Sequence, residues 1–217
     1  MNPDPPLDTN NIWYLGEGIQ TGTYVQYSIS RSDANMGLPF IMTIWFKEQN
    51  RDGNWIVPVE VIDQGKTING TFILSKTNLT ILDRTGIPGE MGSYINAYSD
   101  TLTWLSTYIP PSGRSLSTTE WDRTDGASGP TVALRGKEDI AIPGGIFNTT
   151  VLSYDTGSWV SESIIWIKDG FPYPVKAQTF RDVASSDTAD VPIDYAFELQ
   201  KSGVGTPPIL SKTSNLE

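Results

Sequence analysis

Residues 145–181 read GIFNTTVLSYDTGSWVSESIIWIKDGFPYPVKAQTFR, and β-branched and aromatic residues run through most of this stretch. Two groups of turn residues interrupt it, at Asp155-Thr156-Gly157 and at Asp169-Gly170. Runs of this composition separated by such residues are typical of antiparallel strands. Three consecutive strands are therefore expected, at 147–154, 163–168 and 173–180, and together they would form the central wall of a sheet.

The chain repeats this pattern on both sides of the central stretch. Further strands are expected at 23–30, 40–47, 55–62, 67–74, 77–82, 132–142 and 193–200, with a short one between 116 and 121. Residues 40–47 are apolar on both faces, which predicts a strand that is covered on both sides. Pro58 lacks a backbone N–H and therefore indicates an edge position or a bulge.

One segment has helical periodicity. The apolar residues between Pro88 and Pro110 recur at spacings of three and four: Met91, Tyr94, Ile95, Tyr98, Leu102, Leu105 and Ile109. This spacing puts them on one stripe of a helix near 89–109, and Pro110-Pro111 ends it. A single apolar stripe packs against a sheet. The sequence thus predicts a mainly β fold of the α+β class, with one β-rich domain at 23–201 and one main helix.

Composition excludes several kinds of chemistry. The 217-residue chain has neither Cys nor His, so the usual ligands for zinc, copper, haem and iron–sulfur clusters are missing, and no metal or other cofactor is expected. Catalysis by Ser-His-Asp or Cys-His groups is excluded for the same reason. The formal net charge is −10, which opposes binding to nucleic acid because phosphate contacts need clustered Lys and Arg.

The two ends of the chain are expected to be extended. Residues 1–22 begin MNPDPPLDTNN, which lacks the basic and apolar regions of a signal peptide, and residues 202–217 resemble a flexible linker. The final Leu216-Glu217 resembles a cloning scar, so a leader or membrane anchor is expected to lie outside this sequence. Three sequons, at Asn69, Asn78 and Asn148, are candidate glycosylation sites and favour an extracytoplasmic location, secreted or at the cell surface.

The common catalytic motifs are missing from the sequence. There is no phosphate-binding loop and no G-x-S-x-G nucleophile motif. The remaining enzymatic option is a pair of carboxylates facing across a cleft, as in glycosidases. The candidates in or beside expected strands are Glu60, Glu120, Asp122, Glu162 and Glu198. Acidic loops at 122–126 and 187–190 do not have the spacing of an EF-hand, and turn formation accounts for them. The sequence therefore favours a protein that is not an enzyme, without excluding one.

Three runs of residues resemble a known family. They are Gly144-Gly145-Ile146-Phe147-Asn148-Thr149-Thr150-Val151, then Ile164-Ile165-Trp166-Ile167, then Pro172-Tyr173-Pro174-Val175-Lys176-Ala177. This succession is similar to that of the half-barrel domains of lipoprotein carriers, over residues 140–200. Residues 23–109 match that family only in the order of strands followed by a helix. In composition, the chain also looks like secreted archaeal surface domains.

The resemblance implies a curved antiparallel sheet or half-barrel with the helix on its concave face. Alternate residues of the long strands would line that face, and the candidates for an apolar ligand site are Trp45, Trp55, Phe147 and Trp166. The ligand would be a lipid or another apolar small molecule, unless the helix fills the concavity. Two alternatives stay open: a carbohydrate-binding or carbohydrate-active domain, and a structural domain of a cell-surface assembly.

Overall fold

The computed structural model describes residues 11–32, 37–123, 131–155, 162–180 and 193–207. Its strands are β1 (Ile12–Trp13), β2 (Thr23–Arg31), β3 (Phe40–Phe46), β4 (Glu48–Gln49), β5 (Trp55–Asp63), β6 (Lys66–Leu74), β7 (Ile81–Asp83), β8 (Arg114–Ser115), β9 (Glu120–Arg123), β10 (Thr131–Ile142), β11 (Gly145–Asp155), β12 (Glu162–Ile167), β13 (Lys176–Phe180) and β14 (Ile193–Val204). The helical segments are η2 (Gly89–Met91), α1 (Gly92–Thr101) and η3 (Trp104–Thr107). Within the described residues, none of these helices is long and apolar enough to cross a membrane.

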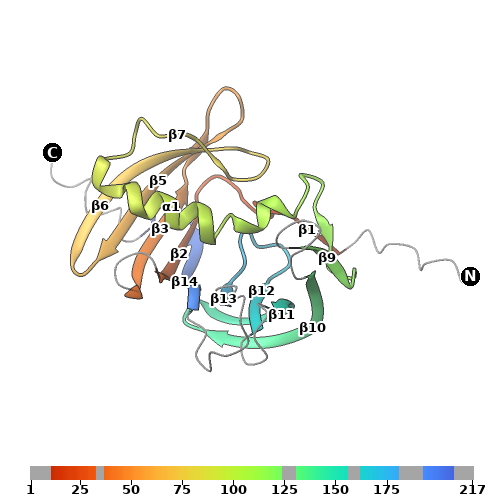
Figure 1. The fold of residues 1–217 in the computed structure, drawn as a ribbon. Helices are drawn as coiled ribbons and strands as arrows, with labels where there is room; N and C mark the ends of the chain where they lie inside the picture. Colours follow the sequence, from red (N-terminus) through yellow and green to blue (C-terminus); the bar gives the residue numbers. More distant parts are fainter. Residues whose placement is uncertain (1–10, 33–36, 124–130, 156–161, 181–192, 208–217) are drawn as a thin grey trace, which may run out of the picture.

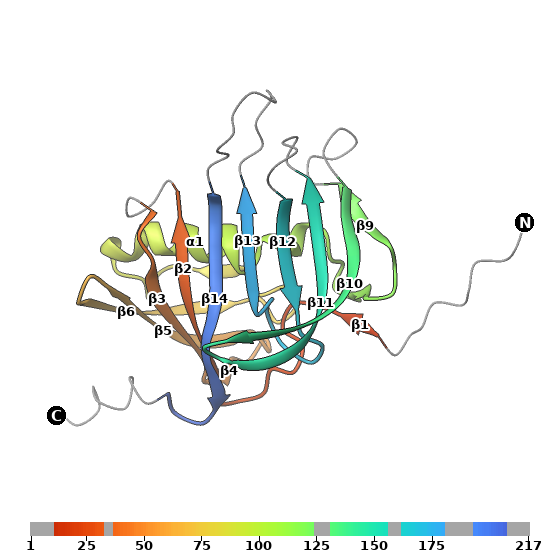
Figure 2. The ribbon, with the colours of Figure 1, turned by 90° about the horizontal axis from the view of Figure 1, so that it is seen from below.

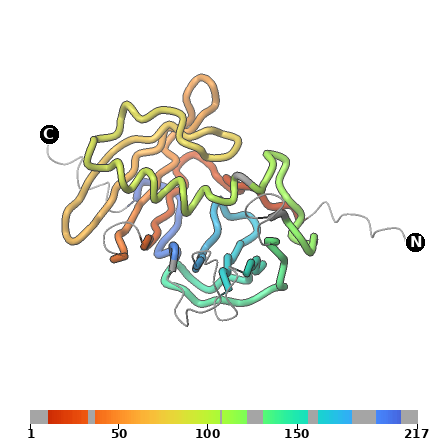
Figure 3. Tube along the Cα trace, viewed as in Figure 1, coloured from red at the N-terminus to blue at the C-terminus, as the bar shows by residue number. Residues whose placement is uncertain are grey.

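Twelve strands form one antiparallel sheet, in the order β7-β6-β5-β3-β2-β14-β13-β12-β11-β10-β9, with β4 paired to β5. The sheet curves strongly, and α1 lies across its concave side (Figures 1 and 2). Strand β14 lies between β2 and β13, so the last of the described strands joins the strands of the chain's two halves, as the trace in Figure 3 shows. The predicted fold class, a curved antiparallel sheet with one main helix on the concave side, is confirmed.

The helical region is shorter and less regular than predicted. Residues 89–109 hold a single α-helical segment, α1, flanked by the 3₁₀ segments η2 and η3. The apolar stripe nevertheless faces the sheet, because Met91, Tyr98 and Leu102 are completely buried. A 3₁₀ turn also repeats every three residues, so the spacing from Leu102 to Leu105 fits either kind of helix.

Buried aromatic side chains fill the centre of the concave face. Tyr27, Tyr98 and Tyr173 are completely buried, and their rings meet edge to face at centroid distances of 6.2 Å. The Tyr27 hydroxyl donates to the carbonyl of Pro174 at 3.0 Å, and the Tyr98 hydroxyl donates to that of Leu79 at 2.7 Å. The Tyr173 and Tyr98 hydroxyl oxygens are 3.0 Å apart. Each buried hydroxyl thus has a partner, as a stable core requires.

Prolines shape the strands at two places, and the N-terminal segment packs onto the core. Tyr173 precedes β13 instead of belonging to it, because Pro172 and Pro174 cannot donate to a neighbouring strand. Strand β5 is not at an edge, because Pro58 pairs with Thr71 of β6 on one side and lies on the other between the residues that pair with β3 and those that pair with β4. Trp13, before β2, is completely buried and donates its indole N–H to the carbonyl of Phe171 at 2.8 Å.

The remaining strand boundaries shift by a few residues. Strand β7 begins at Ile81 instead of residue 77, because the chain turns through Leu79, whose φ is +58°. Strand β14 continues to Val204, beyond the expected linker start at 202. Between 114 and 123 two short strands occur, β8 and β9, in place of one at 116–121.

Candidate functional site

The four aromatic residues expected on the concave face do not come together there. Trp55 is buried on the inner side, where its ring meets Phe46 at 5.7 Å. Trp45 alternates with the buried Ile44 and Phe46 of β3, and Trp166 with the buried Ile165 and Ile167 of β12, so both project from the outer face. Phe147 is half-buried in the β10–β11 hairpin, 6.3 Å from Phe171. Strand alternation thus separates Trp45 and Trp166 from Trp55, and a ligand at any of the four residues stays a prediction.

The outer-face tryptophans have different surroundings. Trp166 donates its indole N–H to Glu138 Oε2 at 3.0 Å, and the Lys176 ammonium lies 5.5 Å from its ring centre. The indole nitrogen of Trp45 is buried without a hydrogen-bond partner. Glu60, which lies opposite Thr43 on the neighbouring strand, is 3% exposed, and its Oε1 also has no partner. Burial raises the pKa of the Glu60 carboxyl.

The other candidate residues are spread over the outer surface. Glu162 pairs with Arg135 at 2.6 Å and Glu198 with Lys176 at 3.1 Å, so two of the candidate carboxylates are already in ion pairs. Of the three sequon asparagines, Asn69 and Asn148 are exposed. Asn78 is half-buried, and its side-chain oxygen accepts a hydrogen bond from the Thr80 hydroxyl at 2.9 Å. Their glycosylation stays a prediction.

A cleft of about 510 Å³ lies at one end of the sheet, where β2 and β11 end and β14 begins. The ends of α1 and η3 form its other wall. Its lining is Arg31, Thr80, Ser99, Asp100, Thr103, Trp104, Ser106, Tyr154, Asp194 and Tyr195. This volume lies in the range of about 300–1,000 Å³ that small-molecule sites occupy. Most of these residues are polar, so the cleft is not the continuous apolar cavity that an acyl chain needs.

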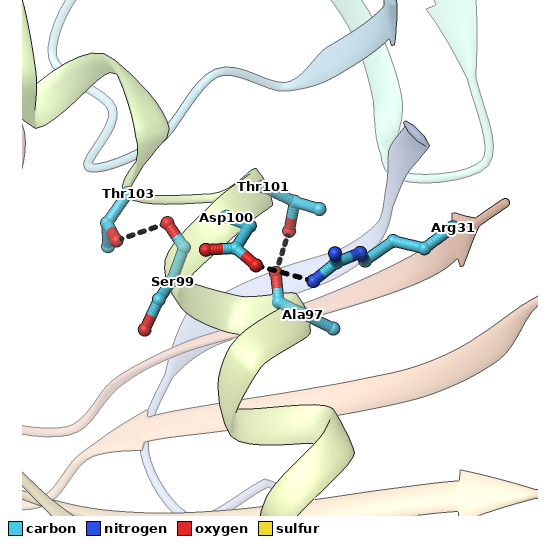
Figure 4. A network of polar contacts seen from close by, with 6 residues as sticks. All are labelled: Arg31, Ala97, Ser99, Asp100, Thr101 and Thr103. Atoms are coloured by element: carbon cyan, nitrogen blue, oxygen red, sulfur yellow. Dashed lines mark hydrogen bonds and ion pairs between the residues drawn. The ribbon is translucent and has the colours of Figure 1, made fainter. Parts of the chain in front are cut away.

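An ion pair joins the two walls of the cleft. Arg31 is the last residue of β2, and its Nη1 lies 2.6 Å from Asp100 Oδ2 on the last turn of α1 (Figure 4). The Arg31 side chain is 16% exposed and that of Asp100 is 58% exposed. Nearby hydroxyls serve the helix end instead: Thr101 donates to the carbonyl of Ala97 at 2.6 Å, and Thr103 donates to that of Ser99 at 3.0 Å.

Three aromatic rings form the apolar part of the cleft. The half-buried Trp104 stacks on Tyr154, with ring centres 5.7 Å apart, and meets Tyr195 edge to face at 6.4 Å. Burial raises the pKa of Tyr154 to about 12, although hydrogen bonds to Ser163 and Thr179 lower it. Burial likewise raises the pKa of Tyr195 well above its ordinary value. Both phenols are therefore neutral at physiological pH and act as hydrogen-bonding and packing groups.

Sequence reasoning missed this cleft because its residues are far apart in the chain. Arg31 ends β2, Asp194 is the second residue of β14, Asp100 lies in the last turn of α1, and Trp104 follows that helix. The available signal was the position of Arg31 at the end of one expected strand and of Asp194 at the start of another. These strands are neighbours only in the folded sheet. Among the described residues, no group of three or more Asp or Glu gathers to hold a metal ion.

Comparison with known proteins gives no family. No protein-family model matches the chain, and no curated protein matches it. Two solved structures are similar over 89% of this chain and 99% of theirs, each at 11% identity. One is a protein from Bacteroides fragilis, described as exported and as having a YmcC-like fold, with a TM-score of 0.40. The other is described as a lipoprotein from Parabacteroides distasonis, with a TM-score of 0.37.

Proposed function

We propose that this protein is an extracytoplasmic binding domain whose cleft holds a saccharide. The supporting observation is the lining of the cleft, which combines the half-buried Trp104 with charged and hydroxyl side chains. A pyranose ring has an apolar C–H face and a rim of hydroxyl groups. An aromatic ring matches the first, and Arg, Asp, Ser and Thr side chains match the second.

Packing of the core disfavours a lipid in the concavity. The centre of the concave face is occupied by side chains that are completely buried, among them Tyr27, Phe46, Phe72, Tyr98 and Tyr173. An acyl chain would have to displace them and break the hydrogen bonds of their hydroxyl groups. A ligand at the end of the sheet requires no such displacement. The three sequons remain the support for an extracytoplasmic location.

Binding is tested by screening an immobilised panel of neutral and acidic oligosaccharides, followed by calorimetry on those retained. Trp104→Ala should weaken binding about tenfold or more, because a tryptophan that contacts the ligand often carries a large share of the binding energy. Trp166→Ala is the matched control, since it removes a half-buried tryptophan from the outer face. Circular dichroism establishes that both variants are folded.

Three outcomes contradict the proposal. They are retention of no saccharide, equal loss in Trp104→Ala and Trp166→Ala, and unchanged binding in Trp104→Ala. The location is tested separately, by the intact mass and peptide map of protein purified from its own host. Glycan mass on the exposed Asn69 or Asn148 supports export. An unmodified chain recovered from the cytoplasmic fraction contradicts it.

A further inference from the structure

The Arg31–Asp100 pair combines an enclosed cation with an exposed anion. The Arg31 side chain is 16% exposed and that of Asp100 is 58% exposed, although their atoms are only 2.6 Å apart. Arg31 is the last residue of β2, a strand that pairs with β14 on one side and β3 on the other. This pairing fixes the position of the Arg31 backbone. The guanidinium is thus enclosed, and the more exposed carboxylate of Asp100 reaches it from the end of α1 (Figure 4).

Asp100 occupies a poor position for a negative charge. It lies in the last turn of α1, where the helix dipole presents its negative end. No basic residue lies in that turn to compensate. An exposed carboxylate contributes little to an ion pair, and an anion that replaces Asp100 keeps the enclosed Arg31 guanidinium paired. The Asp100 carboxylate can therefore leave Arg31 at small cost when another anion takes its place.

We propose that the cleft selects acidic saccharides, and that the ligand's carboxylate replaces Asp100 on the Arg31 guanidinium. This inference rests on the proposed function, since it names the kind of saccharide bound. The planar guanidinium can donate two parallel hydrogen bonds to a carboxylate, which gives direction as well as charge. The Trp104 ring lines the same cleft, where it would stack on the apolar C–H face of that sugar.

A second carboxylate limits the expected selectivity. Asp194 also lines the cleft, and its charge opposes the entry of an anion. The preference for acidic over neutral sugars should therefore be moderate and should fall as salt is added, because mobile ions screen exposed charges. Asp194→Asn should raise the affinity for an acidic sugar without raising that for a neutral one.

The test uses two probes of the same shape, trigalacturonate and its methyl ester, in which the same rings carry no charge. The unaltered protein should bind the acid more tightly than the ester. Asp100→Asn should strengthen acid binding about threefold, because the competing carboxylate is removed. Arg31→Gln should abolish the preference for the acid. Glu90→Gln is the charge-matched control, since Glu90 is an exposed carboxylate paired with Lys66 at the start of the helical region, and it should change neither affinity.

The outcomes separate this inference from the proposed function. Equal, Trp104-dependent binding of acid and ester overturns the selectivity for acids and leaves saccharide binding standing. Absence of binding to both probes, when the panel retains other sugars, also overturns it. If Arg31→Gln does not fold, Asp100→Asn still decides the matter, because unchanged or weaker acid binding in that variant contradicts the exchange.

Discussion

The centre of the concave face and the cleft at its end both contain aromatic rings beside hydroxyl groups, but only the centre is closed. Tyr27, Tyr98 and Tyr173 are completely buried, and each hydroxyl has a partner within the protein. At the end, Trp104 and Tyr154 stay half-buried among charged side chains. Distance from the sheet's end, more than residue type, therefore separates structural aromatic rings from those able to contact a ligand.

Removing a ring from the centre should have the largest effect. Tyr173→Ala should lower the free energy of unfolding by about 3–5 kcal/mol, since it opens a cavity among tightly packed rings. The ring of Tyr173 contacts those of Tyr27, Phe46 and Tyr98. Urea denaturation followed by circular dichroism measures the change. The comparison fails if Trp104→Ala in the cleft costs as much stability as Tyr173→Ala.

Deleting one hydroxyl from the centre should have the next largest effect. Tyr98→Phe leaves the Leu79 carbonyl and the Tyr173 hydroxyl without their partner, which should cost about 1–3 kcal/mol. Tyr14→Phe is the control, because Tyr14 is 39% exposed and water can satisfy its hydroxyl. The same denaturation measurement applies to both. Equal costs for the two variants would show that the buried hydroxyl network contributes nothing of its own.

Glu60 extends the comparison to the outer face, where a buried polar group lacks a partner. Glu60→Gln should raise the free energy of unfolding at neutral pH by on the order of 1 kcal/mol, because the uncharged amide is cheaper to bury than a carboxylate. The folded-state pKa of Glu60 is raised by burial, so folding favours its protonated form. The unaltered protein should therefore lose stability as pH rises from the unfolded-state pKa through the folded one.

The glutamine variant has no such titration. The difference in free energy of unfolding between the variant and the unaltered protein should be smallest at pH values below the ordinary pKa of a glutamate. It should grow as pH rises and then level off. Urea denaturation of both proteins at a series of pH values measures this difference. An advantage that does not change with pH would mean that Glu60 has the same pKa in the folded and unfolded chain.

The smallest effect on stability is expected in the cleft itself. Asp100→Asn should change the free energy of unfolding by less than about 0.5 kcal/mol, because exposed carboxylates contribute little and the asparagine oxygen can still accept a hydrogen bond from the enclosed Arg31. The Asp100 side chain is 58% exposed. A loss of more than 1 kcal/mol, on the order of a buried hydrogen bond, would show that the Arg31–Asp100 pair holds the two walls together. The cleft would then be a structural junction resembling the centre.

Strand positions and the buried faces of several strands follow from local pattern. Val25, Tyr27 and Ile29 share one face of β2, as alternation predicts, and all three are completely buried. Alternation also separates Trp45 from Ile44 and Phe46 in β3. However, β3 is covered on both faces, with Thr43 only 1% exposed, so its composition does not show which side is inner. The spacing of apolar residues likewise predicted the buried stripe of the helical region. It did not predict the change from the α-helix α1 to the 3₁₀ segment η3.

The candidate site could not be predicted in this way. The cleft depends on which strands are neighbours, and β2 pairs with β14 across more than half of the chain's length. No local pattern encodes that pairing, because each strand carries the same alternation of inward and outward residues. Asp100 could be assigned to a polar helix face from the sequence, whereas its contact with Arg31 required the packing of the helix on the sheet.

The central place of β14 has a consequence for how the chain is made. Strands β2 to β7 precede it by many residues, and β10 to β13 precede it directly, yet neither set completes the sheet without residues 193–204. Until these residues leave the ribosome, β2 and β13 each keep an open edge that can pair with another chain. Completion of the sheet is therefore a late event in synthesis, and it depends on contacts between residues that are distant in sequence, which form slowly. A chain interrupted before β14 should remain a pair of incomplete sheets and be prone to aggregate.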